Sequence, residues 1–306
     1  MIDIYFKTIK DRLFKKIESD RVGTWINIED ATTEDLAKVS TLTRLDVADF
    51  HDSLDSYEIP RIERQEGNTI LFVRSPDPDD TENFTELLTI IISEKYIITI
   101  SASKNKIISR LLDQKLTVAT TQKSKLLIQI LLRIYQSYNL EIKNVRNIVL
   151  KSRSAAKKVR NADLIEFAES EDVLNQYISA LVPMNNVLEA VRGGKFINLY
   201  EEDEDILQDL LIAGKQAVDI CVVNIKSIKS LRDSYQAVFS NNLNKIIKLF
   251  TALTIILEIP MIMTGLFGMN VPLPFQSNVF GFIYVVMITV TISLTILIIF
   301  WIKKWL

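Results

Sequence analysis

The feature that most constrains this chain is an uncharged run near its C-terminus. No Asp, Glu, Lys or Arg occurs in the 44 residues from Ile259 to Ile302. A soluble domain cannot cover so long a run, whereas one membrane span needs roughly 20 apolar residues. The apolar region is therefore too long for one span and suits two, separated by a stretch with two prolines and several amides that is typical of a turn. We predict a membrane-embedded helical hairpin, which excludes a purely soluble enzyme.

Flanking charge predicts the orientation of this hairpin. Lys245 and Lys248 precede the first span and Lys303 and Lys304 follow the second, whereas the connecting loop is neutral. Because positive residues favour the cytoplasmic side, we expect a multi-pass protein of the plasma (inner) membrane with both termini cytoplasmic and the loop outside. Residues 1–15 contain no apolar core of signal-peptide length, so we expect no signal peptide. Membrane lipid is the expected environment of residues 249–306, with a first helix at 249–270, an external loop at 271–278 and a second span at 279–302.

Residues 1–115 are predicted to form a cytoplasmic α/β domain. Short, β-branched runs that are typical of strands occur at 2–6, 24–28, 69–73, 87–92 and 96–100, and helical patterns at 34–39 and 47–54. No glycine-rich nucleotide-binding loop is present. The chain has one Cys and one His, which excludes cysteine-based metal sites and leaves little room for a Ser-His-Asp triad. We therefore expect a protein that is not an enzyme.

Residues 116–248 are predicted to form a cytoplasmic helical stalk. The pattern is helical from 116 to 192, breaks at Gly193-Gly194 and resumes from Asp205 to Phe267. The last helix would be on the order of 95 Å long at ~1.5 Å per residue, which implies a bundle or an oligomer. A basic stretch at 143–160 lacks the interleaved aromatic residues of nucleic-acid grooves. We interpret it as one partner of an oppositely charged helix pair and expect no nucleic-acid ligand.

One stripe on the long helix is more polar than a lipid-facing surface should be. Alternating steps of four and three keep residues on one seam of a supercoiled bundle. The seam comprises Asp233, Ala237, Ser240, Asn244, Ile247, Thr251, Thr254, Glu258, Met261, Gly265 and Gly268. Unsatisfied polar groups are costly in hydrocarbon, so we predict several copies of this helix around a water-filled pore. A tight helix–helix contact is the alternative, which explains Gly265 and Thr254 but not Glu258.

Several motifs resemble those of the CorA magnesium transporter family. Gly268-Met269-Asn270 follows the first span, Phe267 stands where the family's GxYGMN has tyrosine, residues 239–244 resemble its SNxxN motif, and residues 303–306 resemble its basic tail. The resemblance covers the whole chain, with motifs concentrated after residue 230. It implies a funnel-shaped homopentamer with an α/β cytoplasmic domain, a helical stalk and two C-terminal transmembrane helices.

The resemblance also implies roles for individual residues. Asn270 would form an external ring that holds a hydrated cation, Gly268 and Met269 would shape its turn, and Asn244 and Asp233 would line the cytoplasmic end of the pore. Neutral amide oxygens suit Mg²⁺, which gives up water reluctantly. Asp52 and Asp209 would bind regulatory Mg²⁺ between subunits. The alternative for each is a solvated surface carboxylate.

Two departures from the family pattern keep the transported ion open. The loop from Val271 to Asn278 lacks the usual acidic residue, and Glu258 replaces a hydrophobic constriction. Like-charged carboxylates in one ring cannot all ionise cheaply, so protonation of Glu258 should be partial and coupled. We predict a channel or transporter for Mg²⁺, gated by cytoplasmic Mg²⁺. The alternatives are a Zn²⁺, Co²⁺ or Ni²⁺ transporter of the same architecture, with proton coupling through Glu258, and a membrane-tethered scaffold without transport.

Overall fold

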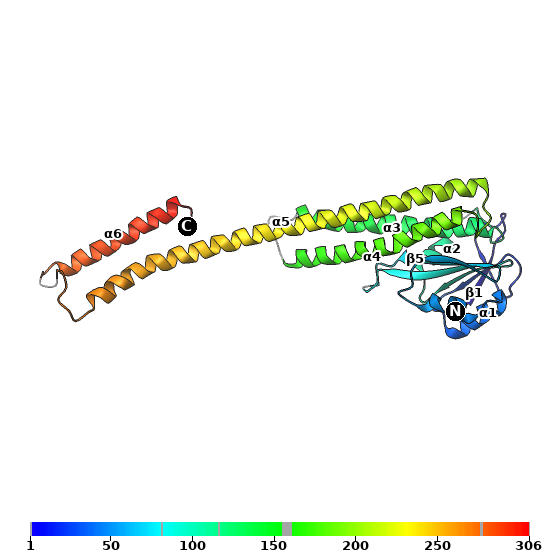
Figure 1. Ribbon diagram of the computed structural model, residues 1–306, viewed down its shortest axis with the longest axis horizontal. Coiled ribbons are helices and arrows are strands. Elements are labelled where there is room, and N and C mark those ends of the chain that lie inside the picture. The colour runs from blue at the N-terminus through cyan, green and yellow to red at the C-terminus, as the bar shows by residue number, and fades with distance from the viewer. Residues whose placement is uncertain (1, 81, 116, 155–160, 276–277, 306) are drawn as a thin grey trace. The chain divides into compact units, whose positions relative to one another are not determined.

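The computed structural model describes residues 2–80, 82–115, 117–154, 161–275 and 278–305. By internal packing the chain divides into two units, residues 1–230 and residues 231–306. Helix α5, Glu201–Phe267, begins in the first unit and ends in the second (Figure 1). The domain boundaries predicted at residues 115 and 248 remain predictions, because the division into two packing units does not test them.

The first unit is built on a seven-stranded mixed sheet with the order β2-β1-β3-β7-β6-β5-β4. Its strands are β1 (Ile2–Phe6), β2 (Lys15–Ile17), β3 (Trp25–Ile28), β4 (Arg61–Gln65), β5 (Asn68–Pro76), β6 (Thr85–Ile92) and β7 (Ile97–Ser101). Only the β3–β7 pair is parallel, with Trp25 opposite Ile97. The five predicted strands are confirmed, whereas β2 and β4, the two edge strands of this sheet, were not predicted.

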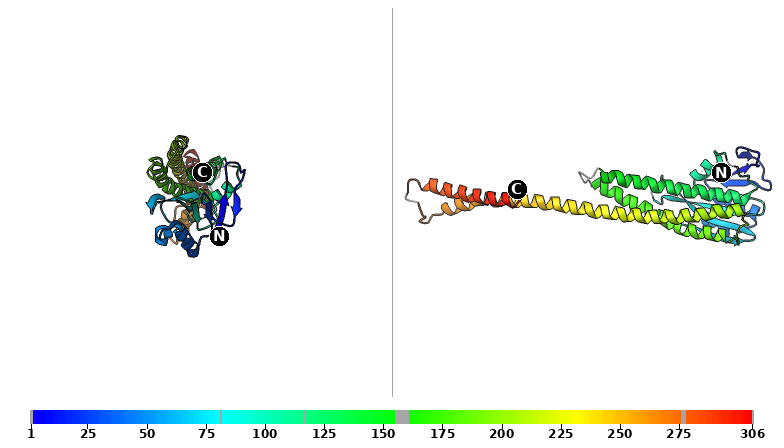
Figure 2. Two further views of the ribbon diagram at one scale, coloured as in Figure 1. Left: turned by 90° about the vertical axis from the view of Figure 1, so that its right-hand side faces the viewer. Right: turned by 90° about the horizontal axis from the view of Figure 1, so that it is seen from above.

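Helices cover both faces of the sheet in the first unit (Figures 1 and 2). On one face lie α1 (Thr33–Thr43) and the short helix η1 (Val47–Leu54), which bury a core that includes Leu36, Phe50 and Phe72. The predicted helical pattern at 47–54 is confirmed, and the segment is a 3₁₀ helix in which Phe50 has non-helical backbone angles. Capping boxes at Thr32 and Asp46 begin the two helices.

The opposite face carries the long helices α3 (Lys123–Ser154) and α4 (Asn161–Arg192), with α2 (Lys106–Leu112) beside α3. The helical region predicted from 116 to 192, with consecutive helices, is confirmed as α3 and α4, except that α3 begins only at Lys123. Residues 155–160 lie outside the described ranges. The predicted break at Gly193-Gly194 is confirmed, since α4 ends at Arg192 and Gly194 is left-handed with φ +72°.

A glycine allows α5 to approach these helices closely. A Cβ at Gly214 would lie 2.1 Å from Oδ1 of Asn185 and 2.7 Å from the ring of Tyr135. The Tyr135 hydroxyl donates to that same Asn185 oxygen over 3.0 Å. Three helices therefore meet at one buried polar contact, and no larger side chain fits at position 214 without displacing it.

The second unit is a hairpin of the C-terminal part of α5 and α6 (Gly281–Ile302). Both helices are long and apolar enough to cross a membrane, and they are almost fully exposed in the isolated chain. The predicted first membrane helix reached residue 270, but α5 ends at Phe267, because Gly268 and Met269 already form a turn closed by hydrogen bonds to Thr264 and Leu266. The second span begins two residues later than predicted.

Candidate functional site

The predicted seam of α5 is exposed along its whole length. All eleven positions from Asp233 to Gly268 are solvent-accessible in the isolated chain. From residue 249 onward, the buried and half-buried positions of α5 lie on another face: Ala252, Ile255, Ile256, Ile259, Met263 and Phe267. Successive helical residues differ by about 100°, which places these residues at about 60° to 180° from Glu258, on a face beside the seam.

The apolar face of α5 is the one that packs against α6. The half-buried and buried positions of α6 recur every three or four residues: Gly281, Val285, Thr289, Ser293, Ile296 and Phe300. At the loop end, Pro260, Met263 and Phe267 of α5 share one pocket with Phe282 and Val285 of α6. Because α6 occupies this side, the seam is left free to face other copies of the helix or a water-filled axis.

Glu258 is the only Asp, Glu, Lys or Arg in the sequence from residue 249 to residue 302. Its side chain is exposed on the seam, between Thr254 and Met261. Among the described residues it has neither an ion-pair nor a hydrogen-bond partner within the chain. The hydroxyls of Thr254 and Thr264 are instead satisfied by the backbone oxygens of Phe250 and Met261. An unpartnered carboxyl group at membrane depth is a functional candidate by default.

Asn270 lies in the turn that follows α5, with its side chain exposed. Gly268 donates its N–H to the Thr264 oxygen over 2.9 Å, which ends the helix just before the Met269-Asn270 pair. A Cβ at Gly268 would lie 3.0 Å from the same Thr264 oxygen. The turn therefore leaves the Asn270 amide free at the end of the hairpin, where it can contact a hydrated ion.

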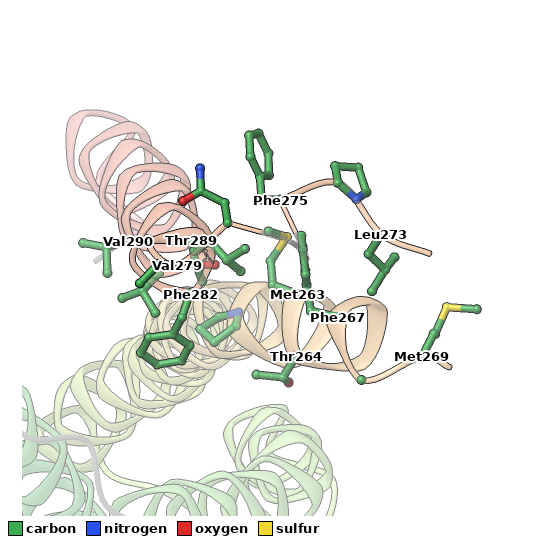
Figure 3. A pocket seen from close by; sticks show the side chains of 17 residues that line it. Met263, Thr264, Phe267, Met269, Leu273, Phe275, Val279, Phe282, Thr289 and Val290 are labelled. Carbon is green, nitrogen blue, oxygen red and sulfur yellow. Dashed lines mark hydrogen bonds between the residues drawn. The ribbon is translucent and has the colours of Figure 1, made fainter. Parts of the chain in front are cut away.

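The connecting loop folds back onto α6. Phe275 adopts a left-handed backbone with φ +69°, and its ring lies 6.0 Å from that of Tyr284. Gly281 lets the chain pass here, since a Cβ there would lie 2.3 Å from the Phe275 oxygen. Beneath the loop is a pocket of about 810 Å³ with a mainly apolar lining, and Figure 3 shows Met263, Phe267 and Phe282 around it. Its chemistry suits hydrocarbon rather than a metal ion.

Asp52, the first predicted regulatory ligand, lies in η1 and already has a cationic partner. Arg61 donates to it through Nη2 over 2.9 Å and also pairs with Glu58 and Glu63. The guanidinium lies over the ring of Phe72, 4.0 Å from its centroid. Arg61 therefore holds three carboxylates on the surface of the sheet. Sequence reasoning missed this clamp, although the Arg61/Glu63 spacing of two on one strand face was a signal for part of it.

Asp209, the second predicted ligand, is exposed near the start of α5. Within the described ranges, no group of three or more His, Cys, Asp or Glu side chains is arranged to hold a metal ion. A metal site that uses Asp52 or Asp209 is therefore not preformed by His, Cys, Asp and Glu side chains of the described residues alone.

Comparisons with known proteins agree with this arrangement. A family model described as CorA-like Mg²⁺ transporter protein matches residues 20–304. The cobalt/magnesium transport protein CorA of Methanocaldococcus jannaschii is 27% identical over 294 residues, which cover 92% of this chain and 90% of that protein.

Solved structures share the fold over nearly the full length. The complete structure of the CorA magnesium transporter from Methanocaldococcus jannaschii has a TM-score of 0.84 at 24% identity, and the match covers 100% of this chain and 99% of that chain. The full-length CmaX protein has a TM-score of 0.76 at 13% identity, with 96% and 97% covered. With the family model matching most of its length, the chain belongs to the CorA-like family of divalent-cation transporters.

Proposed function

We propose that the chain transports Mg²⁺ through a homopentameric pore lined by the seam of α5. The observation that carries the proposal is the division of α5 into two faces: an apolar face covered by α6 and an exposed seam with Glu258, Thr254 and Thr251. Asn270 would form the entry ring, and Asn244 and Asp233 the cytoplasmic end. The name of the Methanocaldococcus jannaschii relative, a cobalt/magnesium transport protein, supports Mg²⁺ as the ion.

The proposed topology follows from charge. Lys245 and Lys248 lie at one end of the first span and Lys303 and Lys304 at the same end of the second, whereas the loop is neutral. We place the hairpin in the plasma membrane, with both termini in the cytoplasm. The α/β unit then samples cytoplasmic Mg²⁺.

A second candidate is transport of Zn²⁺, Co²⁺ or Ni²⁺ with proton coupling. The exposed, unpartnered Glu258 favours it, because a titratable ring in the pore links ion passage to protons. The neutral loop provides no electrostatic attraction for any divalent cation at the entrance, so it does not distinguish the two candidates.

Flux into proteoliposomes tests both candidates. Purified protein is reconstituted, and uptake of Mg²⁺ and Zn²⁺ is followed with ion-sensitive dyes, with and without an imposed pH gradient. We expect Mg²⁺ uptake that needs no gradient. Zn²⁺ uptake that rises with the proton gradient would favour the second candidate, and absence of any divalent flux in assembled protein contradicts both.

Gating by Mg²⁺ gives a prediction for Asp52 and Asp209. Replacing both with alanine should remove the Mg²⁺-dependent protection of residues 201–248 against protease, since Mg²⁺ could no longer bridge subunits there. The folded state itself should lose little, because the Asp52–Arg61 pair is partly exposed and such pairs contribute about 0–1 kcal/mol. The measurement is limited proteolysis across a Mg²⁺ titration, with Asp79→Ala as the control on an exposed acid. Unchanged protection in the double variant would place the sensor elsewhere.

A further inference from the structure

A small acidic cavity lies in the first unit, apart from Asp52 and from the seam. It has a volume of about 190 Å³ and lies between the end of η1, the β5–β6 turn and the residues that follow β7. Its lining includes four acids and one base: Asp55, Asp77, Asp80, Glu86 and Arg74. Asp52 and the seam residues are not among those that border it. The cavity is therefore distinct from the sites proposed above.

The chain does not neutralise the acids of this cavity. Lys106 pairs with Asp77, with 2.6 Å between Nζ and Oδ1, and it also pairs with the neighbouring Asp79. The other acids of the lining make no ion pair among the described residues. When all four carboxyl groups are ionised, they exceed Arg74 and Lys106 by two charges. One divalent cation balances such an excess.

Arg74 borders the cavity, but its donors are engaged by neutral acceptors. Its guanidinium is buried, and Nε and Nη2 donate to the side-chain and backbone oxygens of Thr85 over 2.9 and 2.8 Å. Nη1 donates to the backbone oxygens of Ser56 and Glu58 over 2.8 and 3.1 Å. Arg74 therefore fixes the segment after η1 to the sheet and leaves the carboxylates available to another cation.

Two of the carboxyl groups are held in place by hydrogen-bond donors. Glu86 accepts from the Ser103 hydroxyl over 2.7 Å and from the Asn105 amide over 2.5 Å. Oδ1 of Asp80 accepts two backbone N–H groups of its own turn over 2.9 and 3.1 Å, and these bonds lower the pKa of Asp80. Burial raises the pKa of Glu86 to about 7, whereas the Ser103 hydrogen bond and Lys106 lower it. A cation in the cavity would further favour the charged form.

Ser53 provides a second indication of a ligand, independent of the charges. Its side chain is 0% exposed and lines the same cavity, yet its hydroxyl has no hydrogen-bond partner among the described residues. Buried polar groups are rarely left without a partner, because the loss of hydration is then uncompensated. A bound ion, or a water that the ion holds, would supply the missing partner.

The size of the cavity favours an ion that keeps its water. One water occupies about 30 Å³ in the liquid, so a cavity of about 190 Å³ holds about six. Among the described residues, no group of three or more His, Cys, Asp or Glu side chains is arranged to hold a bare metal ion. Mg²⁺ usually retains several waters and is bound through one or two carboxylates. Hydrated Mg²⁺ therefore suits both the volume and the spacing of the acids.

We propose that this cavity binds one hydrated Mg²⁺ ion within a single copy of the chain, held by Asp80, Glu86 and the Ser53 hydroxyl. The bound ion joins the end of η1 to the β5–β6 turn and holds residues 53–56 in place. All of its protein contacts come from one subunit. The site therefore rests neither on the proposed pore nor on the proposed pairing of Asp52 with Asp209.

Amide hydrogen exchange of the full-length protein across a Mg²⁺ titration tests this site. Residues 53–56 and 77–80 should exchange more slowly as Mg²⁺ is added. Asp80→Asn keeps an acceptor oxygen for the turn and removes the charge, so the Mg²⁺ concentration for half-protection should rise by roughly tenfold or more. Asp79→Asn is the matched control, since Asp79 is an exposed acid of the same turn that does not line the cavity, and its midpoint should stay at the wild-type value.

Ser53→Ala gives a signature that general damage to the fold cannot give. Loss of one hydrogen-bonding group should raise the Mg²⁺ midpoint by roughly three- to tenfold. Without Mg²⁺, the same segments should exchange no faster than in wild type, because the variant removes a buried hydroxyl that has no partner in the described chain. Faster exchange in both conditions would indicate a purely structural role of Ser53 and contradict its part in the site.

The variant with Asp52→Ala and Asp209→Ala separates this site from the proposed regulatory pair. Neither residue borders the cavity, so Mg²⁺ protection of residues 53–56 and 77–80 should persist in the double variant. Loss of that protection would assign it to the pair and overturn the proposal. Absence of Mg²⁺ protection in wild type, or equal midpoints in wild type, Asp80→Asn and Ser53→Ala, would overturn it as well. Divalent flux in proteoliposomes has no bearing on these outcomes.

Discussion

Replacing Asn270 with alanine is expected to abolish divalent-cation flux while assembly is retained. The exposed Asn270 amide follows the end of α5, and a ring of such amides is the proposed site where the hydrated ion first binds. One exposed side chain of this kind changes stability by about 0.5 kcal/mol or less, so the oligomer should form normally. Flux is measured in proteoliposomes, and oligomer size by chromatography of the same preparation.

Asn278 provides the matched control for this experiment. It is the other amide in the described part of the loop, and its side chain accepts the N–H of Phe280 over 2.9 Å. Asn278→Ala should lose that local contact and keep flux. Normal Mg²⁺ flux through Asn270→Ala, or equal losses in both variants, would contradict a specific role of Asn270 in the entry ring.

The second large effect is expected at Glu258. A ring of these carboxyl groups facing the pore should make flux depend on pH near neutrality, because a bound cation favours the ionised form and expels protons. Wild-type flux should change by up to about tenfold per pH unit on the steep part of its profile. Glu258→Gln keeps the shape of the side chain and removes titration, so its profile should be flat and its preference among divalent ions altered.

The control for Glu258 is an acid of the same helix outside the hairpin. Glu201 is exposed at the start of α5, and Glu201→Gln should keep the wild-type pH profile. Identical pH profiles and ion preferences in wild type and Glu258→Gln would make Glu258 structural, with its carboxyl group protonated and bonded to a neighbouring threonine or backbone oxygen. The proton-coupled candidate would then fail.

The inner strands of the sheet were predictable from the sequence, whereas its two edge strands were not. The runs that became β5, β6 and β7 are β-branched because both faces of these strands are covered. In contrast, β2 and β4 are edge strands with charged residues such as Lys15, Lys16 and Arg61, and charge is how edges avoid pairing with other chains. Their sequences therefore resemble loops. The spacing of apolar residues also could not distinguish the 3₁₀ helix at 47–54 from an α-helix.

The seam was predictable because polar residues in a membrane helix are costly unless they face water or another helix. Its period alone placed Glu258, Thr254 and Gly265 on one face, and the structure shows that α6 packs against another. The hydrogen bonds that join the Glu86 carboxyl group to Ser75 and Asn105 could not be predicted from the sequence. Ser75, Glu86 and Asn105 come from separate segments, and only the folded sheet brings them to one cavity.

The Arg61 clamp has a consequence for when regulation occurs. In the proposed regulatory site, a metal ion at Asp52 would compete with a guanidinium that is already in place and cannot diffuse away. If Asp52 binds Mg²⁺ as proposed, Arg61 acts as an intramolecular competitor, and the apparent affinity for Mg²⁺ is the intrinsic affinity multiplied by the fraction of molecules in which Asp52 is unpaired. Such a competitor would raise the Mg²⁺ concentration at which the site is half filled. The Mg²⁺ concentration that closes the pore would then depend on Arg61 as well as on the metal ligands.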